Sequence, residues 1–396
     1  MRILVTSLIY APDDFRINEI TARLAREGHE VTVLTGLPDY TTSRIPREYR
    51  FFRRRRERIN GCDVIRIPMT ARRHGVFFRA LNYATFALFG ALYARCIRLP
   101  QVDAIFAYET SPVFQVSPAV VLRRRLGVPL VLYCLDIWPE SLKAWNVPES
   151  SPVFRVVRRI SRRLYRAADT VAVSSQPFIA YLEQLGVDPA RLCYLPQDCA
   201  DIGAQPTPAP HGTFDFYYCG NVGAVQNVDC LLRALAQVPE PEARACIVGD
   251  GIELENCRAL AQQLQLGDRA VFCGRVPADR MEEIYRQADA LVLTLRGGDM
   301  IGQTLPAKLQ TYMCVGRPIV AAADGATADE IAAADCGLCV PAGDAEALAQ
   351  AMRTVLRERE TFIEKGRNGR NYYEEHFTTE RFDRQLIGLL KGSKRA

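Results

Sequence analysis

The sequence predicts an α/β protein of two consecutive domains, each with a parallel β-sheet covered by helices. Short apolar runs alternate with amphipathic stretches along nearly the whole chain, which is typical of strand–helix–strand repeats. The length of 396 residues also fits two or three domains of about 150 residues each. Because 48% of the residues are hydrophobic and 24% are charged, each domain can bury a core of its own.

In the first half, apolar runs predict buried strands, and most of them are separated by segments with helical periodicity. The clearest helix is expected over 17–27, where Ile20 and Leu24 repeat on one face. The expected strands span 3–9, 31–34, 64–67, 104–108, 130–135 and 170–173.

The second half repeats this plan after a linker. The segment 203–212 has three prolines in five residues, which cannot continue a helix or a central strand. We therefore expect a first domain over 1–197, a second over 198–371, and a closing helix over 372–396 that crosses back to the first domain. Ligands are expected in a cleft between the carboxyl ends of the two sheets. In the second domain, strands are expected over 214–219, 245–248, 270–273, 290–293 and 318–321, and helices over 229–237, 253–265, 280–287, 306–314 and 345–360.

Three glycine-rich turns follow strands in the second half, at 219–223, 249–251 and 273–277. A strand, a glycine turn and a helix N-terminus together present free backbone amides to an anion. The first turn is therefore a candidate diphosphate cradle, and a plain tight turn is the alternative. The other two turns place backbone beside the expected cleft, where a flat base would sit.

The order and spacing of these motifs resemble the family 4 retaining glycosyltransferases, whose architecture is GT-B. The resemblance covers nearly the whole chain, and two segments, 37–40 and 136–142, are similar to a subgroup that builds bacterial surface polysaccharides. It implies two Rossmann-like domains facing across a cleft, a nucleotide-diphosphate sugar donor in the second domain, an acceptor in the first domain, and no metal or other cofactor. The motifs that carry the resemblance are Tyr218–Gly220, Gly249–Gly251, Phe272–Val276, Gly316–Val320 and Gly28–Gly36.

The resemblance also identifies donor-site residues, with two departures. Gln303 and Thr311 stand where the family usually carries two glutamates. Gln303 can still hydrogen-bond a sugar, whereas Thr311 cannot hold two vicinal hydroxyls as a carboxylate does. The helix that begins near residue 306 is expected to meet the diphosphate with its first amides and with Lys308, for which a solvated helix lysine is the alternative. Arg275 can replace a missing basic residue only if it points inward. The donor-binding candidates are Gly220, Asn221, Gly223, Gly249, Arg275, Val276, Pro306, Ala307, Lys308 and Thr311.

The catalytic candidates are Glu109, Asp136 and Gln303. The family often has a histidine at the end of the fourth strand of the first domain, and Glu109 is the substitute at that place. Asp136 follows a buried strand and is expected to orient the acceptor hydroxyl, with capping of the next helix as the alternative. The mechanism usually drawn for this family needs no protein nucleophile. It needs electrostatic support for the leaving diphosphate from amides and cations.

Arginine clustering predicts an anionic membrane surface as a partner. The net charge of +5 is too small to indicate nucleic acid, but arginines crowd the segment 155–166. The segment 74–98 is apolar and aromatic with cationic ends, which suits a membrane surface, a core helix being the alternative. No signal peptide is apparent at the N-terminus, so we expect a cytoplasmic protein, peripheral at the inner face of the cell membrane.

The leading hypothesis is transfer of a hexose, including an N-acetylamino sugar as a guess from the subgroup, from a UDP-linked donor to a polyprenyl-diphosphate-linked glycan. Two alternatives stay open: a GT-B partner protein that lost activity with its two glutamates, and a nucleotide-sugar epimerase. A nicotinamide dehydrogenase is disfavoured, because the first strand ends in 7–12 without a G-x-G-x-x-G pattern.

Overall fold

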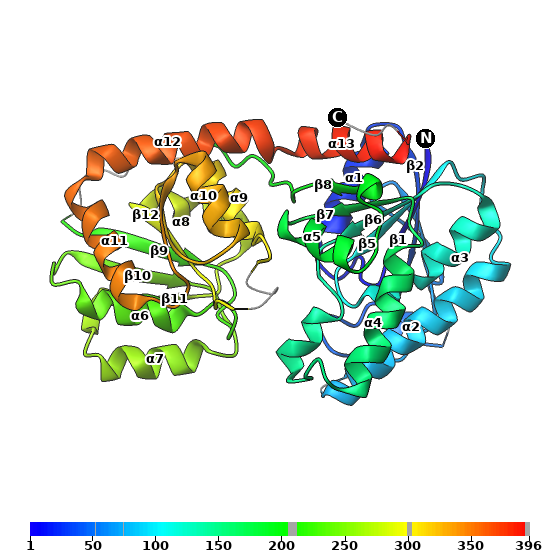
Figure 1. The fold of residues 1–396 in the computed structure, drawn as a ribbon, viewed down its shortest axis with the longest axis horizontal. Coiled ribbons are helices and arrows are strands. Elements are labelled where there is room, and N and C mark those ends of the chain that lie inside the picture. The colour runs from blue at the N-terminus through cyan, green and yellow to red at the C-terminus, as the bar shows by residue number, and fades with distance from the viewer. Residues whose placement is uncertain (52, 74, 205–211, 299–302, 393–396) are drawn as a thin grey trace. The chain divides into compact units, whose positions relative to one another are not determined.

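The chain forms two compact α/β units. The first unit is built from Met1–Leu195 with Asp383–Ala396, and the second from Pro196–Phe382. In each unit, helices lie on both faces of a mainly parallel sheet (Figure 1). Residues 205–211 of the predicted linker lie outside the described part of the chain. The computed structural model describes residues 1–51, 53–73, 75–204, 212–298 and 303–392.

The described part of the first unit contains an eight-stranded sheet in the order β3-β4-β2-β1-β5-β6-β7-β8. Neighbouring strands are parallel, except that β3 pairs antiparallel with β4 at one edge. The strands are β1 (Arg2–Ser7), β2 (Glu30–Thr35), β3 (Arg56–Ile59), β4 (Cys62–Arg66), β5 (Ala104–Glu109), β6 (Leu130–Cys134), β7 (Thr170–Val173) and β8 (Leu192–Tyr194). The helices are α1 (Arg16–Arg26), α2 (Val76–Cys96), α3 (Ser117–Leu126), α4 (Pro152–Tyr165) and α5 (Pro177–Gln184).

The described part of the second unit contains a six-stranded parallel sheet in the order β11-β10-β9-β12-β13-β14. One core packs α6, α7 and α11 on one face of this sheet, and a second core packs α8, α9 and α10 on the other. The strands are β9 (Phe214–Cys219), β10 (Ala243–Val248), β11 (Ala270–Gly274), β12 (Ala290–Thr294), β13 (Ile319–Ala322) and β14 (Gly337–Val340). The helices are α6 (Val228–Gln237), α7 (Leu254–Gln263), α8 (Met281–Gln287), α9 (Ala307–Val315), α10 (Ala326–Ala334), α11 (Ala345–Arg357) and α12 (Arg359–His376).

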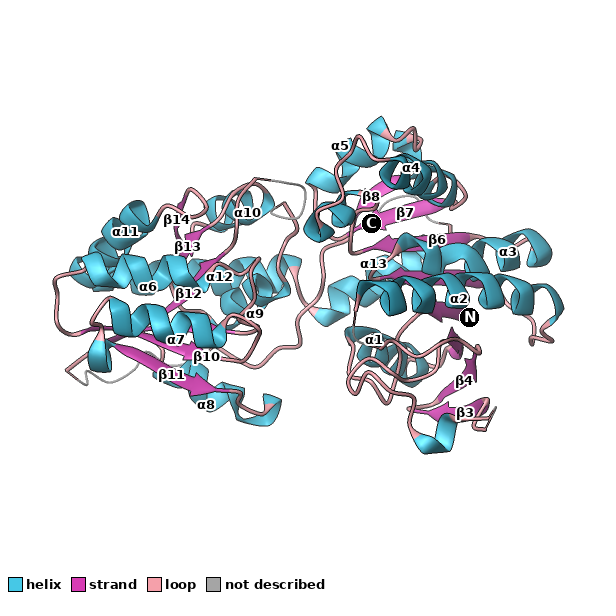
Figure 2. Ribbon diagram, turned by 90° about the horizontal axis from the view of Figure 1, so that it is seen from below, coloured by secondary structure: helices cyan, strands magenta, loops and turns pink. Residues whose placement is uncertain are grey.

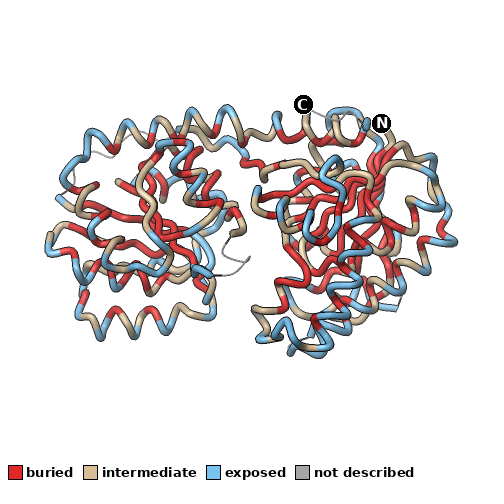
Figure 3. The backbone as a smooth tube through the Cα atoms, in the orientation of Figure 1, coloured by how far each residue is buried: buried red, intermediate tan, exposed pale blue. Residues whose placement is uncertain are grey.

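The central strands are buried along their whole length, which explains their continuous apolar runs. Every residue of β5, β6, β9 and β12 is buried (Figure 3). Helices on both faces of a parallel sheet leave no solvent side, so such strands are mostly apolar. In β1, for example, Val5 lies between Val33 of β2 and Phe106 of β5. The predicted α/β fold class is confirmed.

Three strands escaped prediction because they lack this pattern. The edge strand β3 alternates exposed and half-buried residues and carries two arginines, Arg56 and Arg58. Strands β8 and β14 are only three and four residues long, and all of their residues are half-buried. Edge strands with charged or short sequences carry little hydrophobic signal.

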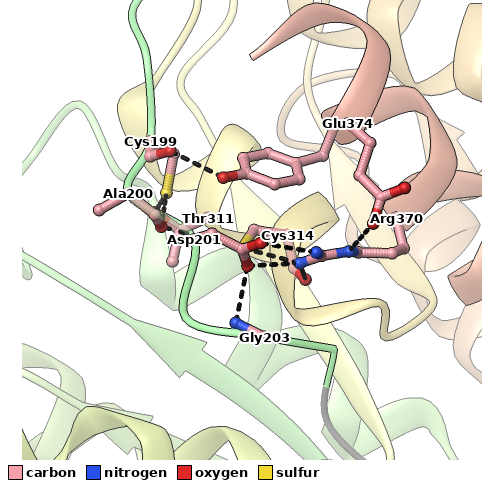
Figure 4. Close-up of polar contacts among 9 residues, drawn as sticks. Cys199, Ala200, Asp201, Gly203, Thr311, Cys314, Arg370 and Glu374 are labelled. Atoms are coloured by element: carbon pink, nitrogen blue, oxygen red, sulfur yellow. Dashed lines mark hydrogen bonds and ion pairs between the residues drawn. The ribbon is translucent and has the colours of Figure 1, made fainter. Parts of the chain in front are cut away.

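The end of the chain forms two helices and not the single closing helix predicted over 372–396. α12 already begins at Arg359 and belongs to the second unit. A Cβ at Gly366 would lie 2.4 Å from the Gly316 carbonyl oxygen, so the absence of a side chain there lets α12 approach the end of α9. Arg370 of α12 donates to both carboxylate oxygens of Asp201, at 2.7 and 2.8 Å, and so fixes the start of the second unit (Figure 4).

The last helix, α13 (Thr379–Leu390), contributes its residues from Asp383 onward to the first unit. Asp383 is buried and accepts two hydrogen bonds from Arg23 of α1, at 2.6 and 2.8 Å. This bidentate pair is the strong form of a salt bridge, because both N–H groups of the guanidinium meet the carboxylate in one plane.

Candidate functional site

The glycine turns of the second unit interlock at the carboxyl ends of its strands. Gly220 follows β9 with φ 137°, and Gly249 follows β10 with φ 147°. A Cβ at Gly249 would lie 1.8 Å from the carbonyl oxygen of Gly220. The Gly249 amide donates to the carbonyl oxygen of Gly274 at 2.8 Å, and the Gly220 amide donates to that of Val248 at 2.8 Å. Three neighbouring strand ends are therefore joined backbone to backbone, which only glycine permits here.

The rest of the first turn continues this contact. The amide of Val222 donates to the carbonyl oxygen of Asp250 at 2.8 Å. The exposed Asn221 donates its side-chain amide to Gln226 at 2.9 Å. A Cβ at Gly223 would lie 2.8 Å from the side chains of both Asn221 and Gln226, so Gly223 leaves space that these two flexible groups occupy.

Lys308, in the first turn of α9, lies beside the glycine turn at Gly220 and forms no ion pair with a described residue. Its Nζ donates to the Tyr218 hydroxyl at 2.8 Å and lies 3.9 Å from the centre of the Tyr218 ring. The same Nζ would lie 3.1 Å from a Cβ at Gly220. No described carboxylate forms an ion pair with it, and burial lowers the pKa of Lys308 to about 8. The Tyr218 hydroxyl in turn donates to the carbonyl oxygen of Asn221 at 2.5 Å.

The start of α9 adds backbone donors to the same place. Pro306 is the cap residue of α9 and Ala307 is its first residue. The first amides of an α-helix have no acceptor within the helix, and the helix dipole favours an anion there. The structure thus brings together Gly220, Asn221, Gly223, Gly249 and Lys308, and Lys308 follows directly on Pro306 and Ala307.

Four predicted residues are placed elsewhere in the second unit. Arg275 is exposed and makes no hydrogen bond or ion pair with a described residue, and Val276 packs into the core between the sheet and α8 to α10. The Thr311 hydroxyl lies 3.4 Å from the Ala307 carbonyl oxygen in its own helix and 3.4 Å from the Cys199 thiol (Figure 4). Gln303 lies against Gly325, the residue that precedes α10.

In the first unit, Glu109 ends β5 in complete burial. Neither of its carboxylate oxygens has a hydrogen-bond partner among the described residues. Burial, reinforced by the nearby Asp136 carboxylate, holds the pKa of Glu109 well above its ordinary value, and the neighbouring Cys134 offsets this only in part. This environment favours the protonated, neutral form of Glu109 over the carboxylate, which suits an acid better than a base.

Asp136 follows β6 and is held by side chains. It accepts hydrogen bonds from the Ser141 hydroxyl at 2.5 Å and from the Trp138 indole at 3.1 Å. The Trp138 indole also donates to the Ser111 hydroxyl at 3.1 Å. Burial raises the pKa of Asp136, although these bonds favour the ionised form. The capping alternative is not found, because the following 3₁₀ helix, Glu140–Trp145, has no side-chain cap.

Beside these residues, a cavity of about 210 Å³ opens at the carboxyl ends of β1 and β5. Ser111, which bonds Trp138, lines it together with Asp39, Arg72, Tyr83 and Trp145. Asp39 is buried and accepts hydrogen bonds from the Arg72 amide at 2.6 Å and the Asn82 side chain at 2.9 Å. Burial raises the pKa of Asp39 to about 6.

Sequence reasoning did not select Asp39, although one signal was available. Asp39 follows the second strand closely, and carboxylates at strand ends in a parallel sheet converge on one edge. Its partner Asn82 lies in α2, 43 residues away, and no local pattern connects the two.

Asp39 should leave a signature in the pH dependence of stability. Its folded pKa of about 6 exceeds the ordinary value of 3.8, so the folded state binds more protons and stability falls as pH rises between those values. Replacing Asp39 with asparagine removes this contribution. We expect the melting temperature of Asp39→Asn, relative to the wild type, to rise by about 4 °C between pH 4 and pH 7.5. An unchanged difference between the two pH values would contradict the assigned environment.

The described residues contain no group of three or more histidine, cysteine, aspartate or glutamate side chains placed to hold a metal ion. The candidate groups of the second unit are backbone amides and the half-buried Lys308, and those of the first unit are the hydrogen-bonded Asp136 and the buried Glu109.

Two parallel-sheet units with glycine turns at the strand ends fit the GT-B fold, and comparison with known proteins gives the family. Residues 15–198 match the model of the glycosyl transferase 4-like domain, and residues 203–372 match that of the glycosyl transferases group 1. The chain belongs to the family 4 glycosyltransferases of the GT-B fold and is an enzyme of the glycosyltransferase class.

Individual relatives agree with this family. The putative colanic acid biosynthesis glycosyl transferase WcaI of Escherichia coli (strain K12) is 24% identical over 99% of this chain and 100% of its own length. The probable glycosyltransferase WbjE of Pseudomonas aeruginosa is 26% identical, with the match spanning about half of each chain, 54% of this one and 55% of WbjE. The structure of Anabaena Alr3699/HepE in complex with UDP and glucose has a TM-score of 0.72 at 16% identity, covering 98% of this chain and 99% of that one.

Proposed function

We propose that the enzyme is a retaining hexosyltransferase that uses a UDP-linked donor, an N-acetylamino sugar being one candidate, and a polyprenyl-diphosphate-linked glycan as acceptor. The donor proposal is supported by one observation above all. Lys308 is a largely enclosed cation that no described carboxylate neutralises, and it lies beside a glycine turn and the start of α9. A diphosphate supplies the missing negative charge and accepts from the helix amides. The complex of HepE with UDP and glucose, on the same fold, agrees with this donor class.

The proposed chemistry follows from the charges of the two half-sites. Lys308 and the amides of α9 stabilise the negative charge that develops on the leaving diphosphate. The diphosphate oxygen accepts the proton of the acceptor hydroxyl, so no strong protein base is required. Asp136, fixed by Ser141 and Trp138, accepts a hydrogen bond from the acceptor hydroxyl and orients it. Gln303 hydrogen-bonds the donor sugar, and Glu109 keeps its proton behind Asp136.

Thermal stabilisation by nucleotides, without added metal, tests the donor half of this proposal. A ligand that binds only the folded state raises the melting temperature by mass action. We expect a shift with UDP and a larger shift with one UDP-sugar. Sugar transfer or donor hydrolysis by the same preparation separates an active enzyme from an inactive partner protein. A folded protein that responds to no nucleotide diphosphate would overturn the proposal.

A surface of the first unit supports the proposed peripheral membrane location. α2 is the one described helix that is long and apolar enough to cross a bilayer by length and composition, and only 22% of its apolar window is buried. A core helix would be mostly covered, so that alternative does not account for α2. Its N-terminal residues Val76 and Phe77 are 60% and 72% exposed. Residue 74, where the predicted segment begins, is outside the described part of the chain.

Arginines lie on the helices next to α2. α2 packs on α3 (Figure 2). Residues of α3 and of α4 and its end line a shared depression. α4 also exposes Val153, Val156 and Ile160 among its arginines. Apolar side chains between clustered cations suit a surface of anionic lipid headgroups. The depression is lined by Arg124, Arg159, Arg162, Arg163 and Arg166, together with Ala167.

Neutralising α4 should release the protein from anionic vesicles. We expect vesicle binding in a sedimentation assay to fall at least about tenfold, because each cation near an anionic surface contributes about 1 kcal/mol. Retained binding together with lost activity would contradict the membrane proposal. The matched control neutralises four exposed, ion-paired arginines of the second unit and should bind as the wild type does. The test variant carries Arg158→Gln, Arg159→Gln, Arg162→Gln and Arg163→Gln, and the control carries Arg233→Gln, Arg258→Gln, Arg280→Gln and Arg286→Gln.

A further inference from the structure

A second and larger cavity of the first unit has no place in the function described so far. It encloses about 940 Å³ at the carboxyl ends of β2 and β4. Leu37, just after β2, and Pro68 and Met69, just after β4, form its apolar part. The remaining wall comes from residues between Thr42 and Arg55, before β3, and from Ala71 and Arg73, after β4.

The cavity is strongly cationic. Arg44, Arg50, Arg55 and Arg73 line it, and no aspartate or glutamate is among its lining residues. Arg44, Arg50 and Arg73 form no ion pair with a described carboxylate. Arg50 donates only to a backbone oxygen, that of Ile45, at 2.9 Å.

The carboxylate that bonds to Tyr49, a residue of the cavity wall, is already engaged by another group. Glu57 of β3 pairs with the buried Arg66 at 2.6 Å and lies 3.4 Å from the Tyr49 hydroxyl. Arg55 is half-buried in the cavity wall, and this burial lowers its pKa. Arg44, Arg50 and Arg73, clustered and without an ion pair to a described carboxylate, favour a ligand with two or more negative charges, and the guanidinium fork matches phosphate oxygens.

The cavity continues at one end into an apolar surface. The guanidinium of Arg73 lies 5.7 Å from the centre of the Phe78 ring, in the first turn of α2. Val76 and Phe77 are exposed in the same turn, and Leu81 follows one turn later at 37% exposure. A ligand whose phosphates meet Arg73 therefore finds apolar side chains directly beside them.

On the other side, the cavity shares a wall with the smaller cavity near Asp136. Thr42 and Arg73 line the larger cavity, whereas Tyr40 and Arg72 line the smaller one. The Arg72 amide donates to Asp39 at 2.6 Å and joins the two segments of this wall. The arginine cavity thus adjoins the smaller cavity beside Asp136, and the start of α2 borders both, since Arg79 and Asn82 line the smaller one.

We propose that the arginine cavity binds the diphosphate that links the acceptor glycan to its lipid. The isoprenoid chain leaves along the exposed side chains at the start of α2, and the sugar enters the cavity lined by Asp39 and Ser111. This inference rests on the proposed function, because it assigns a place to the acceptor of that reaction.

Binding of a short-chain isoprenyl diphosphate tests the site separately from catalysis. The full chain is titrated with saturating UDP present, so that the Lys308 site is occupied, and inorganic pyrophosphate and the isoprenol serve as comparison probes. We expect the variant Arg44→Gln, Arg50→Gln, Arg73→Gln to bind the isoprenyl diphosphate about 10–100-fold more weakly, as for lost hydrogen bonds to a charged group. Arg26→Gln, Arg98→Gln, Arg125→Gln loses the same charge at exposed sites and should bind as the wild type does.

The outcomes distinguish a lipid-linked diphosphate from a soluble one. They also distinguish a failure of the cavity proposal from a failure of the proposed function. Tighter binding of the isoprenyl diphosphate than of pyrophosphate, reduced to the pyrophosphate level by Phe77→Ser with Leu81→Ser, supports a lipid-linked acceptor. Equal binding of the two diphosphates would overturn the lipid assignment in favour of a soluble phosphorylated ligand. Unchanged binding by the triple variant would overturn the cavity as the site while UDP still stabilises the protein. A failure of UDP to bind would instead refute the proposed function.

Discussion

Replacing Lys308 with methionine is expected to weaken UDP binding by about 10–100-fold and to raise the melting temperature of the ligand-free protein by about 2–4 °C. Both effects have one cause. Lys308 carries its charge in a largely enclosed place where no described carboxylate neutralises it, so its folded pKa of about 8 is below the ordinary 10.5. Methionine removes the desolvated charge but keeps an unbranched side chain over the Tyr218 ring.

The effects of Lys308→Met on the melting temperature and on UDP binding should both depend on pH. A lysine with a depressed folded pKa destabilises the folded state below that pKa, and this effect disappears as pH rises from about 8 to 10.5. The gain in melting temperature of Lys308→Met should therefore shrink at high pH. UDP binding to the wild type should weaken as pH rises past 8, since the anion binds the charged amine, and the variant should not show this loss.

The control is Lys365→Met in α12. Lys365 is an ion-paired lysine, bonded to the exposed carboxylate of Asp335. This variant should bind UDP as the wild type does and should gain no stability. If Lys308→Met binds UDP with full affinity, the lysine is a structural residue over Tyr218 and the diphosphate lies elsewhere.

More of the groups in the proposed donor site of the second unit than of those in the first unit could be predicted from the sequence, for a physical reason. In the second unit the turn after β9 and the start of α9 are both marked by local signals, a glycine after an apolar run and a proline before a helix. The contact between Gly220 and Lys308 then follows from the convergence of strand ends and helix starts in an α/β sheet. Local patterns were sufficient there, although the predicted Thr311 faces Cys199 and its own helix.

In the first unit the important groups depend on distant partners. Glu109 was selected from its place at a strand end, but its complete burial beside Cys134 and Asp136 comes from the packing of β5 against β6. The bond between Asn82 and Asp39 spans 43 residues, and the arginine cavity is assembled from the segments after β2 and β4. Sequence periodicity does not predict such contacts, because each one joins residues that lie on different helices, strands or loops.

A glycine after a strand can serve ligand binding or close backbone packing, and the sequence alone cannot distinguish these two reasons. The turn of Gly220 was predicted to present free amides to an anion, and the turn of Gly249 to lie beside a base. In the structure the amides of Gly220 and Gly249 instead donate to the carbonyl oxygens of Val248 and Gly274, so these two amides are not free. The two backbones touch each other, and a side chain at Gly249 would occupy the place of the Gly220 carbonyl group. Loss of this contact would move the whole turn, so a defect in donor binding at Gly249 follows from displacement of Gly220 and Lys308.

Replacing Gly249 with alanine is accordingly expected to destabilise the second unit by about 3–5 kcal/mol, through backbone strain and overlap together. The φ of 147° is unfavourable for any residue with a Cβ, and the added carbon would lie 1.8 Å from the Gly220 oxygen and 2.8 Å from the Gly220 carbonyl carbon. Backbone atoms in a sheet cannot move aside as a flexible side chain does. Hydrogen exchange at the amides of β9 and β10 should accelerate, whereas β1 and β5 of the first unit should be protected as before.

Substitutions at two other glycines show how much of the expected destabilisation by Gly249→Ala comes from backbone strain and how much from steric overlap. Gly267 has φ 53° but open space around its Cβ, so Gly267→Ala measures the backbone strain alone, on the order of 1 kcal/mol. At Gly223 a Cβ would meet only the side-chain ends of Asn221 and Gln226, which can move, so Gly223→Ala should also cost only about 1 kcal/mol. If Gly249→Ala proves no more destabilising than Gly267→Ala, the strand ends are not locked together, and the glycine turns serve the ligand alone.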